Sequence, residues 1–248
     1  DNILIVPRDS GSDDKEQLNK AIREIAAEDI KIVIGPINFN EIEEVTKYSN
    51  MIFISPSNIN PRIKKNVISI GISLESQLLS LKKFLKKQKK IKTVILFPDN
   101  GYARIIKEKI KELDFKNYKT FVYSSDSKIL TGEIEKLTNY TQRKRNLEIR
   151  KNIVKKRDDE NSKKELKKLD QIYTIGKVDF DSVIVIDFGN RLKSVLSSLI
   201  FTDVNQDEVL FTTVNQWFDK SIFYENSLKE LYYPSINYTN FDDYNKKY

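Results

Sequence analysis

Short runs of apolar residues recur along the chain, and each ends in polar or turn-forming residues before an amphipathic stretch begins. One run, TVILF at 93–97, stops at Pro-Asp-Asn-Gly, and a helical pattern follows from Tyr102. The same order recurs at 30–45, IKIVIGPINFNEIEEV, and at 180–196, FDSVIVIDFGNRLKSVL. Such runs are typical of buried parallel strands, and open α/β sheets bind ligands where these strands end. The pattern therefore predicts an α/β fold with parallel sheets and right-handed crossovers.

The whole chain can be divided into alternating strands and helices in this way. The predicted strands are 3–7, 30–34, 51–54, 67–70, 93–97, 119–124, 182–186, 209–213 and 231–236. The predicted helices are one capped near Asp13, one over 39–48, one that begins at Ser73 with Leu74, Leu78, Leu81 and Leu85 facing inward, and those over 102–113, from 129 onward and over 191–201.

A length of 248 residues suits two lobes, each with its own core. The lysine-rich stretch 86–92 is suited to a helix end and an exposed link, and we place the lobe boundary there. The predicted organisation is a first lobe at 1–92 and a second lobe at 93–236 that carries a charged helical insertion at about 139–175. A return segment toward the first lobe then occupies 237–248.

The composition narrows the possible chemistry. The chain has no cysteine and no histidine, which removes disulfides, thiol nucleophiles, histidine bases and the commonest zinc ligands. Its seven glycines are scattered singly, so no phosphate-binding loop is present. Asp99 and Asp187 both follow strands, but two carboxylates with no third acid nearby in sequence are a weak basis for catalysis. We expect a protein that is not an enzyme and that uses no cofactor or metal.

The net charge of +7 is concentrated in one segment. Residues 141–168 contain 12 Lys or Arg and 5 Asp or Glu, and 12 − 5 = +7 accounts for the charge of the whole chain. A thin apolar stripe at helical spacing predicts a helical hairpin that turns near 158–161. Such a hairpin is suited to an anionic partner or surface. The alternative is a solvated excursion without a partner, since aromatic residues for stacking on nucleic acid are absent.

Three segments in order carry a resemblance to a known fold: GPINFNEIEEVTKYSNMIFISPSN (35–58), VISIGISLESQLLSLKKFL (67–85) and KTVILFPDNGYARIIKEKI (92–110). They resemble type I periplasmic binding proteins, which are related to branched-chain amino-acid receptors. Within that superfamily the chain is most similar to the penicillin-binding protein activator lipoproteins. The traits that indicate this are the Gly-Pro at 35–36, PDNGY after the crossover, and the charged insertion before a strand and a helix with Arg191 near its start.

The resemblance implies a periplasmic protein, lipid-anchored in the outer membrane, that regulates peptidoglycan synthesis with a class A penicillin-binding protein as its partner. The leader of such a protein is not present in the sequence. The family's opening strand and helix should precede Asp1, and the crossings that complete the first lobe should follow Tyr248, so we expect the first lobe to be partial. Ala103 stands where many relatives carry glycine.

Several residues are candidates for lining a cleft between the lobes. Asp99, Asn100 and Tyr102 follow one strand and are suited to hold a ligand, but Asp-Asn-Gly is also ordinary turn chemistry and Asp99 is suited to cap the next helix. Asp187 is suited to receive an ammonium group or to cap the helix that follows it.

Two further groups are candidates for the same cleft. Ser55, Ser57 and Asn58 follow another strand and are suited to bind an α-carboxylate, while nearby prolines favour a plain loop. Trp217 is a candidate cleft wall, although a tryptophan beside a phenylalanine is more often packed in a core.

Two functions remain open. In the first, the protein docks on a penicillin-binding protein, with Lys155, Lys156 and Arg157 at the hairpin turn as candidate contacts. In the second, it is a solute receptor that closes its lobes on an amino acid or similar molecule and feeds an ABC transporter. The basic insertion favours the first function, because a simple receptor does not need it.

Overall fold

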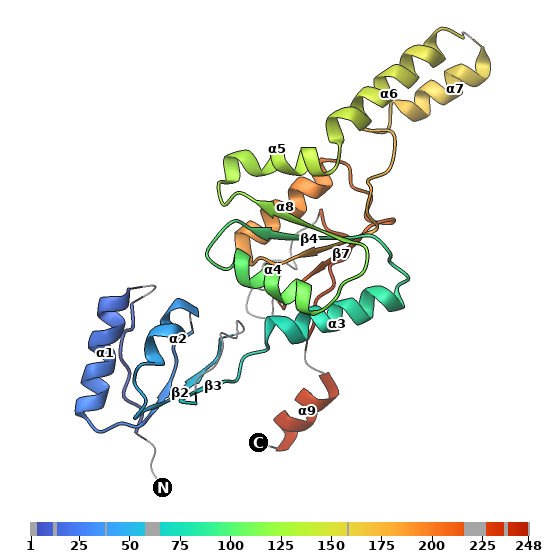
Figure 1. Ribbon diagram of the computed structural model, residues 1–248. Helices are drawn as coiled ribbons and strands as arrows, with labels where there is room; N and C mark the ends of the chain where they lie inside the picture. Colours follow the sequence, from blue (N-terminus) through green and yellow to red (C-terminus); the bar gives the residue numbers. More distant parts are fainter. Residues whose placement is uncertain are drawn as a thin grey trace. The chain divides into compact units, whose positions relative to one another are not determined.

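Figure 1 shows the computed structural model of the protein, which describes residues 4–11, 14–37, 39–57, 65–157, 159–215, 227–235 and 238–247. The chain divides into two compact units, Asp1–Gln77 and Leu78–Tyr248. The division falls within helix α3 (Leu74–Lys87), whose Lys82 Nζ donates hydrogen bonds to the carbonyls of Leu113 and Asp114 in the second unit. The lobe bounds that we place at 92 and 236 stay a prediction.

In its described residues, the first unit is a three-stranded parallel sheet packed with helices. Its elements are α1 (Lys15–Ala27), β1 (Ile32–Ile34), α2 (Phe39–Val45), β2 (Ile52–Ser55) and β3 (Val67–Ser69), and the strand order is β1-β2-β3. Helix α1 begins after Asp14, whose carboxylate accepts hydrogen bonds from the backbone N–H groups of Glu16 and Gln17. A side chain in that position satisfies the free N–H groups of the first helical turn. The cap is therefore Asp14, in agreement with the predicted cap near Asp13.

The two faces of this sheet differ in their surroundings. Val33, Phe53 and Val67 alternate onto the face that packs with α1 and α2 around one apolar core. The alternate positions of these strands point to the other face of the sheet and carry isoleucines that are exposed. Ile34 is 80% exposed and Ile68 is 50% exposed. Parallel sheets are normally covered on both faces, and a strand with one face in water normally alternates with polar residues. The second face thus has the composition of a buried surface.

The predicted strand 3–7 is wrong. Residues 4–7 have no strand conformation, and Leu4 and Ile5 are 86% and 80% exposed. A run of apolar residues forms a strand only where a neighbouring strand accepts its backbone hydrogen bonds, and in the described part of the chain β1 pairs with β2 alone.

The second unit is built on a four-stranded parallel sheet. Its strands are β4 (Thr93–Pro98), β5 (Tyr118–Tyr123), β6 (Ser182–Val185) and β7 (Leu210–Thr213), in the order β5-β4-β6-β7. Its helices are α4 (Ala103–Glu112), α5 (Ser127–Leu137), α6 (Tyr140–Lys155), α7 (Glu160–Leu169), α8 (Gly189–Phe201) and α9 (Tyr238–Lys247). Every residue of β4 is buried, as expected for a central parallel strand. Helices α5 and α8 lie on one side of the sheet, and α3 and α4 on the other (Figure 1).

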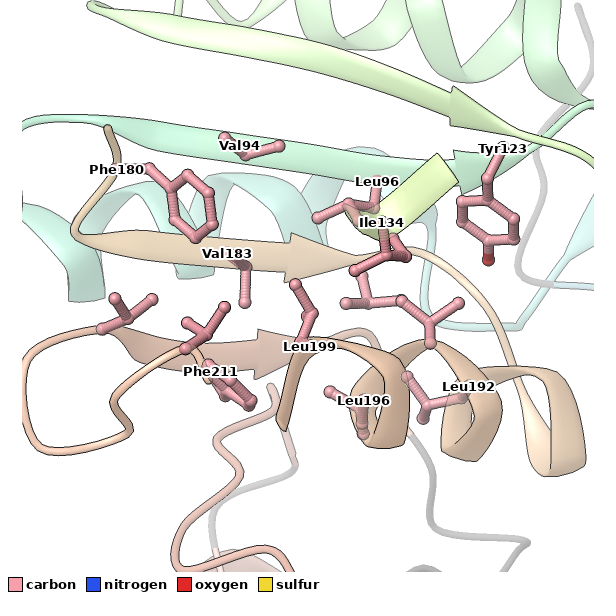
Figure 2. Packing of buried hydrophobic residues seen from close by; sticks show 14 of the residues in the cluster. Val94, Leu96, Tyr123, Ile134, Phe180, Val183, Leu192, Leu196, Leu199 and Phe211 are labelled. Carbon is pink, nitrogen blue, oxygen red and sulfur yellow. The ribbon is translucent and has the colours of Figure 1, made fainter. Parts of the chain in front are cut away.

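One large apolar cluster joins this sheet to α5 and α8 (Figure 2). Val183 and Phe211 come from the sheet, and Ile134, Leu196 and Leu199 from the helices, all of them at most 2% exposed. Each fully buried aliphatic side chain contributes about 1.5–3 kcal/mol of hydrophobic free energy. This cluster therefore contributes a large hydrophobic term to the stability of the second unit.

The predicted strand 231–236 is also wrong. Tyr232 makes one isolated bridge to Thr212, through the hydrogen bonds Thr213 N to Tyr232 O and Tyr232 N to Phe211 O. Two residues later the chain reaches Pro234, which has no backbone N–H to continue a ladder. Ile236 lies outside the described residues.

The charged segment folds as the predicted helical hairpin. Asn139, in a left-handed conformation with φ of 51°, separates α6 from α5. Helices α6 and α7 pack on each other around Leu147, Val154 and Leu169 and extend away from the sheet (Figure 1). Asp159 caps α7 by accepting a hydrogen bond from the backbone N–H of Ser162 at 2.8 Å. The small cluster between the two helices gives the hairpin a core of its own.

A carboxylate bridges two lysines at the amino end of the second sheet. Asp179 accepts hydrogen bonds from Lys92 Nζ at 2.8 Å and from Lys119 Nζ at 3.0 Å, which links the starts of β4 and β5 to the segment before β6. The hydrogen bond from Lys92, followed by that from Lys119, lowers the pKa of Asp179 from 3.8 to about 2.

We expect Asp179 to contribute to the loss of folding stability at acid pH. Between pH 4 and pH 2 the unfolded chain binds a proton at this position while the folded chain does not, so the stabilising contribution of Asp179 is lost as the pH falls. In urea unfolding, the stability difference between wild type and Asp179→Asn should be full above pH 4 and vanish near pH 2. A difference that stays constant over this range would contradict the assignment.

Candidate functional site

The residues after β4 form a tight turn at the carboxyl edge of the second sheet. Asn100 Oδ1 accepts a hydrogen bond from the backbone N–H of Tyr102 at 3.0 Å, and the Asp99 N–H donates to the Tyr123 carbonyl at 2.7 Å. Tyr102 occupies the position before α4 and makes no side-chain cap. Asn100 therefore holds the turn, while the Asp99 side chain is exposed and Tyr102 is half-buried. The turn chemistry of Asn100 agrees with the simpler of the two sequence interpretations.

Asp187 is a buried carboxylate at this edge that several protein groups hold in place. It follows β6, the neighbour of β4, and is 4% exposed. Its Oδ2 accepts a hydrogen bond from the Tyr123 hydroxyl at 2.6 Å, and its Oδ1 accepts one from the backbone N–H of Phe188 at 2.8 Å. The guanidinium of Arg191 lies 3.8 Å from Oδ1. The carboxylate thus stands at the start of α8, where the helix dipole favours a negative charge.

The environment of Tyr123 keeps its hydroxyl protonated. Burial raises the pKa of Tyr123 well above its ordinary range, and the nearby charge of Asp187 raises it further. Tyr123 is the last residue of β5 and is 1% exposed, and Figure 2 shows it at the end toward which the strand arrows point. Tyr123 is not among the site residues predicted from the sequence. Its position at the end of a predicted strand could have indicated it.

This arrangement changes what Asp187 is able to do. Both of its oxygens already accept hydrogen bonds from protein groups, and its charge faces Arg191. A ligand ammonium would have to compete with buried partners. Among the described residues, the contacts of Asp187 therefore fit a structural role, in which the carboxylate joins β5 to α8, better than a ligand-binding role.

The serines of the first unit are also committed to the fold. Ser55, fully buried, donates from Oγ to the Pro36 carbonyl at 2.5 Å and accepts a hydrogen bond from the Ser57 N–H at 3.2 Å. The Ser57 carbonyl accepts a hydrogen bond from Ser69 Oγ at 3.1 Å. A Cβ at Gly71 would lie 2.2 Å from that carbonyl oxygen, so the chain can pass here only as glycine. These contacts hold the loop after β2 against the end of β3.

Two candidates, Asn58 and Trp217, lie outside the described residues. Within the described ranges, no three acidic side chains gather closely enough to hold a metal ion. Two hollows lie at the opposite, amino edge of the second sheet, around Lys92, Asp179 and Phe180, and none of the candidate residues lines them.

Arg143 holds the base of the hairpin to the second unit. It is 7% exposed, and its guanidinium donates four hydrogen bonds of 2.7–3.0 Å to the carbonyls of Gly176, Thr202 and Asp203 and to Thr174 Oγ1. Burial lowers the pKa of Arg143 from its usual value, and Asp203 opposes that shift. Arg143 is one of the basic residues of the charged segment 141–168, but it is buried and does not add to the exposed charge of the hairpin. Its spacing of four residues from the buried Leu147 was the available signal.

The remaining basic residues of the hairpin divide into paired and exposed groups. Arg150 pairs with Glu165 at 2.6 Å, and Lys151 pairs with Asp170 at 3.0 Å, so these two cations hold α6 to α7. Lys155, Lys156 and Arg157 are exposed at the end of α6, next to the turn. The structure thus leaves each of the three candidate contacts open to solvent.

Comparisons with known proteins identify the fold. No protein-family profile matches the sequence, and no curated protein matches it. An extracellular ligand-binding receptor from Rhodopseudomonas palustris HaA2 is similar at a TM-score of 0.55 and 12% identity, over 88% of this chain and 54% of the receptor. One from Verminephrobacter eiseniae is similar at a TM-score of 0.53 and 8% identity, over 81% and 49%. The chain thus spans about half the length of these receptors.

The C-domain of LpoA from Haemophilus influenzae, described as a regulator of PBP1A, is similar at a TM-score of 0.44 and 10% identity, over 93% of this chain and 65% of that domain. A TM-score below 0.5 supports no conclusion here. The similarity to the receptors confirms the predicted class, a mixed α/β fold with parallel sheets like that of periplasmic binding proteins. No helix in the described ranges has the length and apolar character that a membrane span requires.

Proposed function

We propose that this protein is a non-catalytic binding protein of the bacterial cell envelope that docks on a class A penicillin-binding protein and so regulates peptidoglycan synthesis. The observation that carries the proposal is the anchored α6–α7 hairpin, a cationic projection on a fold of ligand-binding receptors. The resemblance of 35–58, 67–85 and 92–110 to activator lipoproteins gives the class of the partner. The corresponding location is the periplasm, with a lipid anchor outside these 248 residues and no cofactor.

The hairpin has the properties of a docking element. Four hydrogen bonds from the buried Arg143 fix its base, and two ion pairs join its helices, so little order has to be gained when a partner binds. The exposed lysines and arginines that remain give it a positive field. Charge of one sign on a projecting element speeds encounter with an acidic partner and orients it.

A second candidate function is that of a solute receptor for an amino acid or a similar small molecule. Two similar structures with TM-scores above 0.5 are described as extracellular ligand-binding receptors, which favours it. The contacts at the strand ends favour it less, since Asp187, Asn100 and Ser55 already bond to neighbouring protein groups. We therefore rank the docking function first.

Charge reversal near the hairpin turn separates the two functions. Replacing Lys155, Lys156 and Arg157 by glutamate changes the local charge by six units, and we expect at least tenfold weaker binding to the periplasmic region of a class A penicillin-binding protein from the same cell. The affinity of the wild type should also fall as salt is added. Surface plasmon resonance at 50 and 300 mM NaCl measures both effects.

Tyr102→Ala is the matched control and should leave that binding unchanged. The receptor function requires the opposite result, in which Tyr102→Ala and Asp187→Ala abolish binding of a small molecule while the glutamate variant is silent. Micromolar or tighter amino-acid binding that depends on Tyr102 in calorimetry would overturn the docking proposal.

A further inference from the structure

One face of α6 carries both charge and exposed aliphatic side chains. Arg145, Ile149, Ile153 and Lys156 follow one another at steps of four, four and three residues, which places them on a single side of the helix. We call these four residues the α6 stripe. It spans 12 residues, 145–156, or about 16 Å along the helix.

The α6 stripe points away from the core of the hairpin. Leu147 and Val154, which pack against α7, lie on the opposite side of α6 and are at most 3% exposed. Ile149 and Ile153 face outward and are 48% and 43% exposed, whereas the rest of this side of the helix is polar. Neither isoleucine belongs to the hairpin core. At exposed positions of a solvated helix, lysine or glutamate would be more soluble and would favour the helical conformation more strongly.

The charges at the two ends of the stripe are available to a partner. Arg145 and Lys156 are exposed, and in the described part of the chain neither makes an ion pair, in contrast to Arg150 and Lys151. An apolar centre with a charged rim is the usual arrangement of a protein docking surface, in which the centre loses its water and the rim directs approach.

We infer that the α6 stripe is the surface through which the hairpin recognises its partner, and that the partner presents an aliphatic or aromatic hollow flanked by carboxylates. The inference rests on the proposed function and names the recognising face. Ile149 and Ile153 enter the hollow, while Arg145 and Lys156 meet the carboxylates. The lysines of α7 contribute long-range attraction only.

A protein partner fits these residues better than a membrane surface. A helix that lies in a bilayer interface uses a broad apolar face, commonly with tryptophan or phenylalanine. The α6 stripe offers two half-exposed isoleucines and no aromatic residue. Its apolar area suits a small hollow on a protein.

Association and dissociation rates distinguish the contribution of the α6 isoleucines from that of the α7 lysines. For Ile149→Ala/Ile153→Ala we expect dissociation from the penicillin-binding protein to be at least tenfold faster, with association within twofold of wild type, because desolvated contacts act mainly on dissociation. For Lys164→Ala/Lys167→Ala, on α7, we expect slower association and unchanged dissociation. The matched control is Ile129→Ala on α5, which removes an isoleucine of similar exposure, 49%, and should change neither rate.

A second variant makes the direction of the effect decisive. Ile149→Lys/Ile153→Lys adds two positive charges, so attraction by charge alone would tighten binding, whereas an aliphatic contact requires that binding weaken. Tighter or unchanged binding of this variant overturns the inference and leaves the docking function in place. Absence of binding by the wild type overturns the docking function itself.

The membrane alternative is tested on the same variants. Vesicles of phosphatidylethanolamine and phosphatidylglycerol at 3:1 serve as the probe. If the alanine variant loses vesicle binding but binds the penicillin-binding protein like wild type, the α6 stripe is a lipid surface and the inference is wrong.

Discussion

Replacing Arg143 by methionine is expected to lower the free energy of unfolding by about 2–4 kcal/mol, because three carbonyls and a threonine hydroxyl lose a charged donor in a largely buried place. Methionine keeps an unbranched apolar chain in place of the arginine methylenes and removes the guanidinium, so the loss is mainly that of the charged hydrogen-bond donor. Urea unfolding followed by circular dichroism measures the effect. Hydrogen exchange should also accelerate at 174–176 and at the start of α6, where the guanidinium joins the two segments.

Arg145→Met is the control, since Arg145 is exposed two residues further along the same helix and its replacement should stay within about 0.5 kcal/mol of wild type. Arg143→Lys should fall between the two, because one ammonium group cannot reach four acceptors that surround a planar guanidinium. Equal stability of Arg143→Met and Arg145→Met would show that the hairpin base does not depend on Arg143.

Replacing Tyr123 by phenylalanine is expected to cost about 1.5–3 kcal/mol of stability, the range for a buried hydrogen bond to a charged group. The ring stays in the core, and Asp187 loses the hydroxyl that donates to Oδ2. A cycle of Tyr123→Phe, Asp187→Asn and the double variant isolates the interaction between the two side chains.

Tyr118→Phe, at the other end of β5, is the matched control and should change stability little, because its ring is only partly buried and no hydrogen bond of its hydroxyl is seen among the described residues. A small cost for Tyr123→Phe with a coupling energy near zero would show that Asp187 finds its stabilisation elsewhere. In that case the carboxylate would again be a candidate for contact with a ligand.

Most of the fold could be predicted from periodicity. The runs before Asp99 and Asp187 are central parallel strands, and Leu74, Leu78, Leu81 and Leu85 are all buried, as their helical spacing requires. The errors fall at 3–7 and 231–236, where the chain is apolar but lacks a continuous ladder of hydrogen bonds. Local composition does not report whether a neighbouring strand is present.

The candidate site was harder to predict for a different reason. The sequence placed Asp187 at a strand end correctly but could not reveal that Tyr123, 64 positions earlier, donates to it. It likewise gave Arg143 a charge but not its burial, since the acceptors come from 174–176 and 202–203. The positions of polar groups follow from periodicity, whereas their partners depend on contacts between distant segments.

Helix α8 connects the two regions discussed above. Its first turn holds Arg191 beside Asp187, and the carbonyl of Thr202, just past its last turn, is an acceptor for Arg143. A helix of 13 residues is about 20 Å long and resists compression, so displacement along its axis at one end is transmitted to the other. A displacement of the first turn of α8 along the helix axis would therefore also displace the Thr202 carbonyl, one of the acceptors that hold Arg143 at the base of the hairpin.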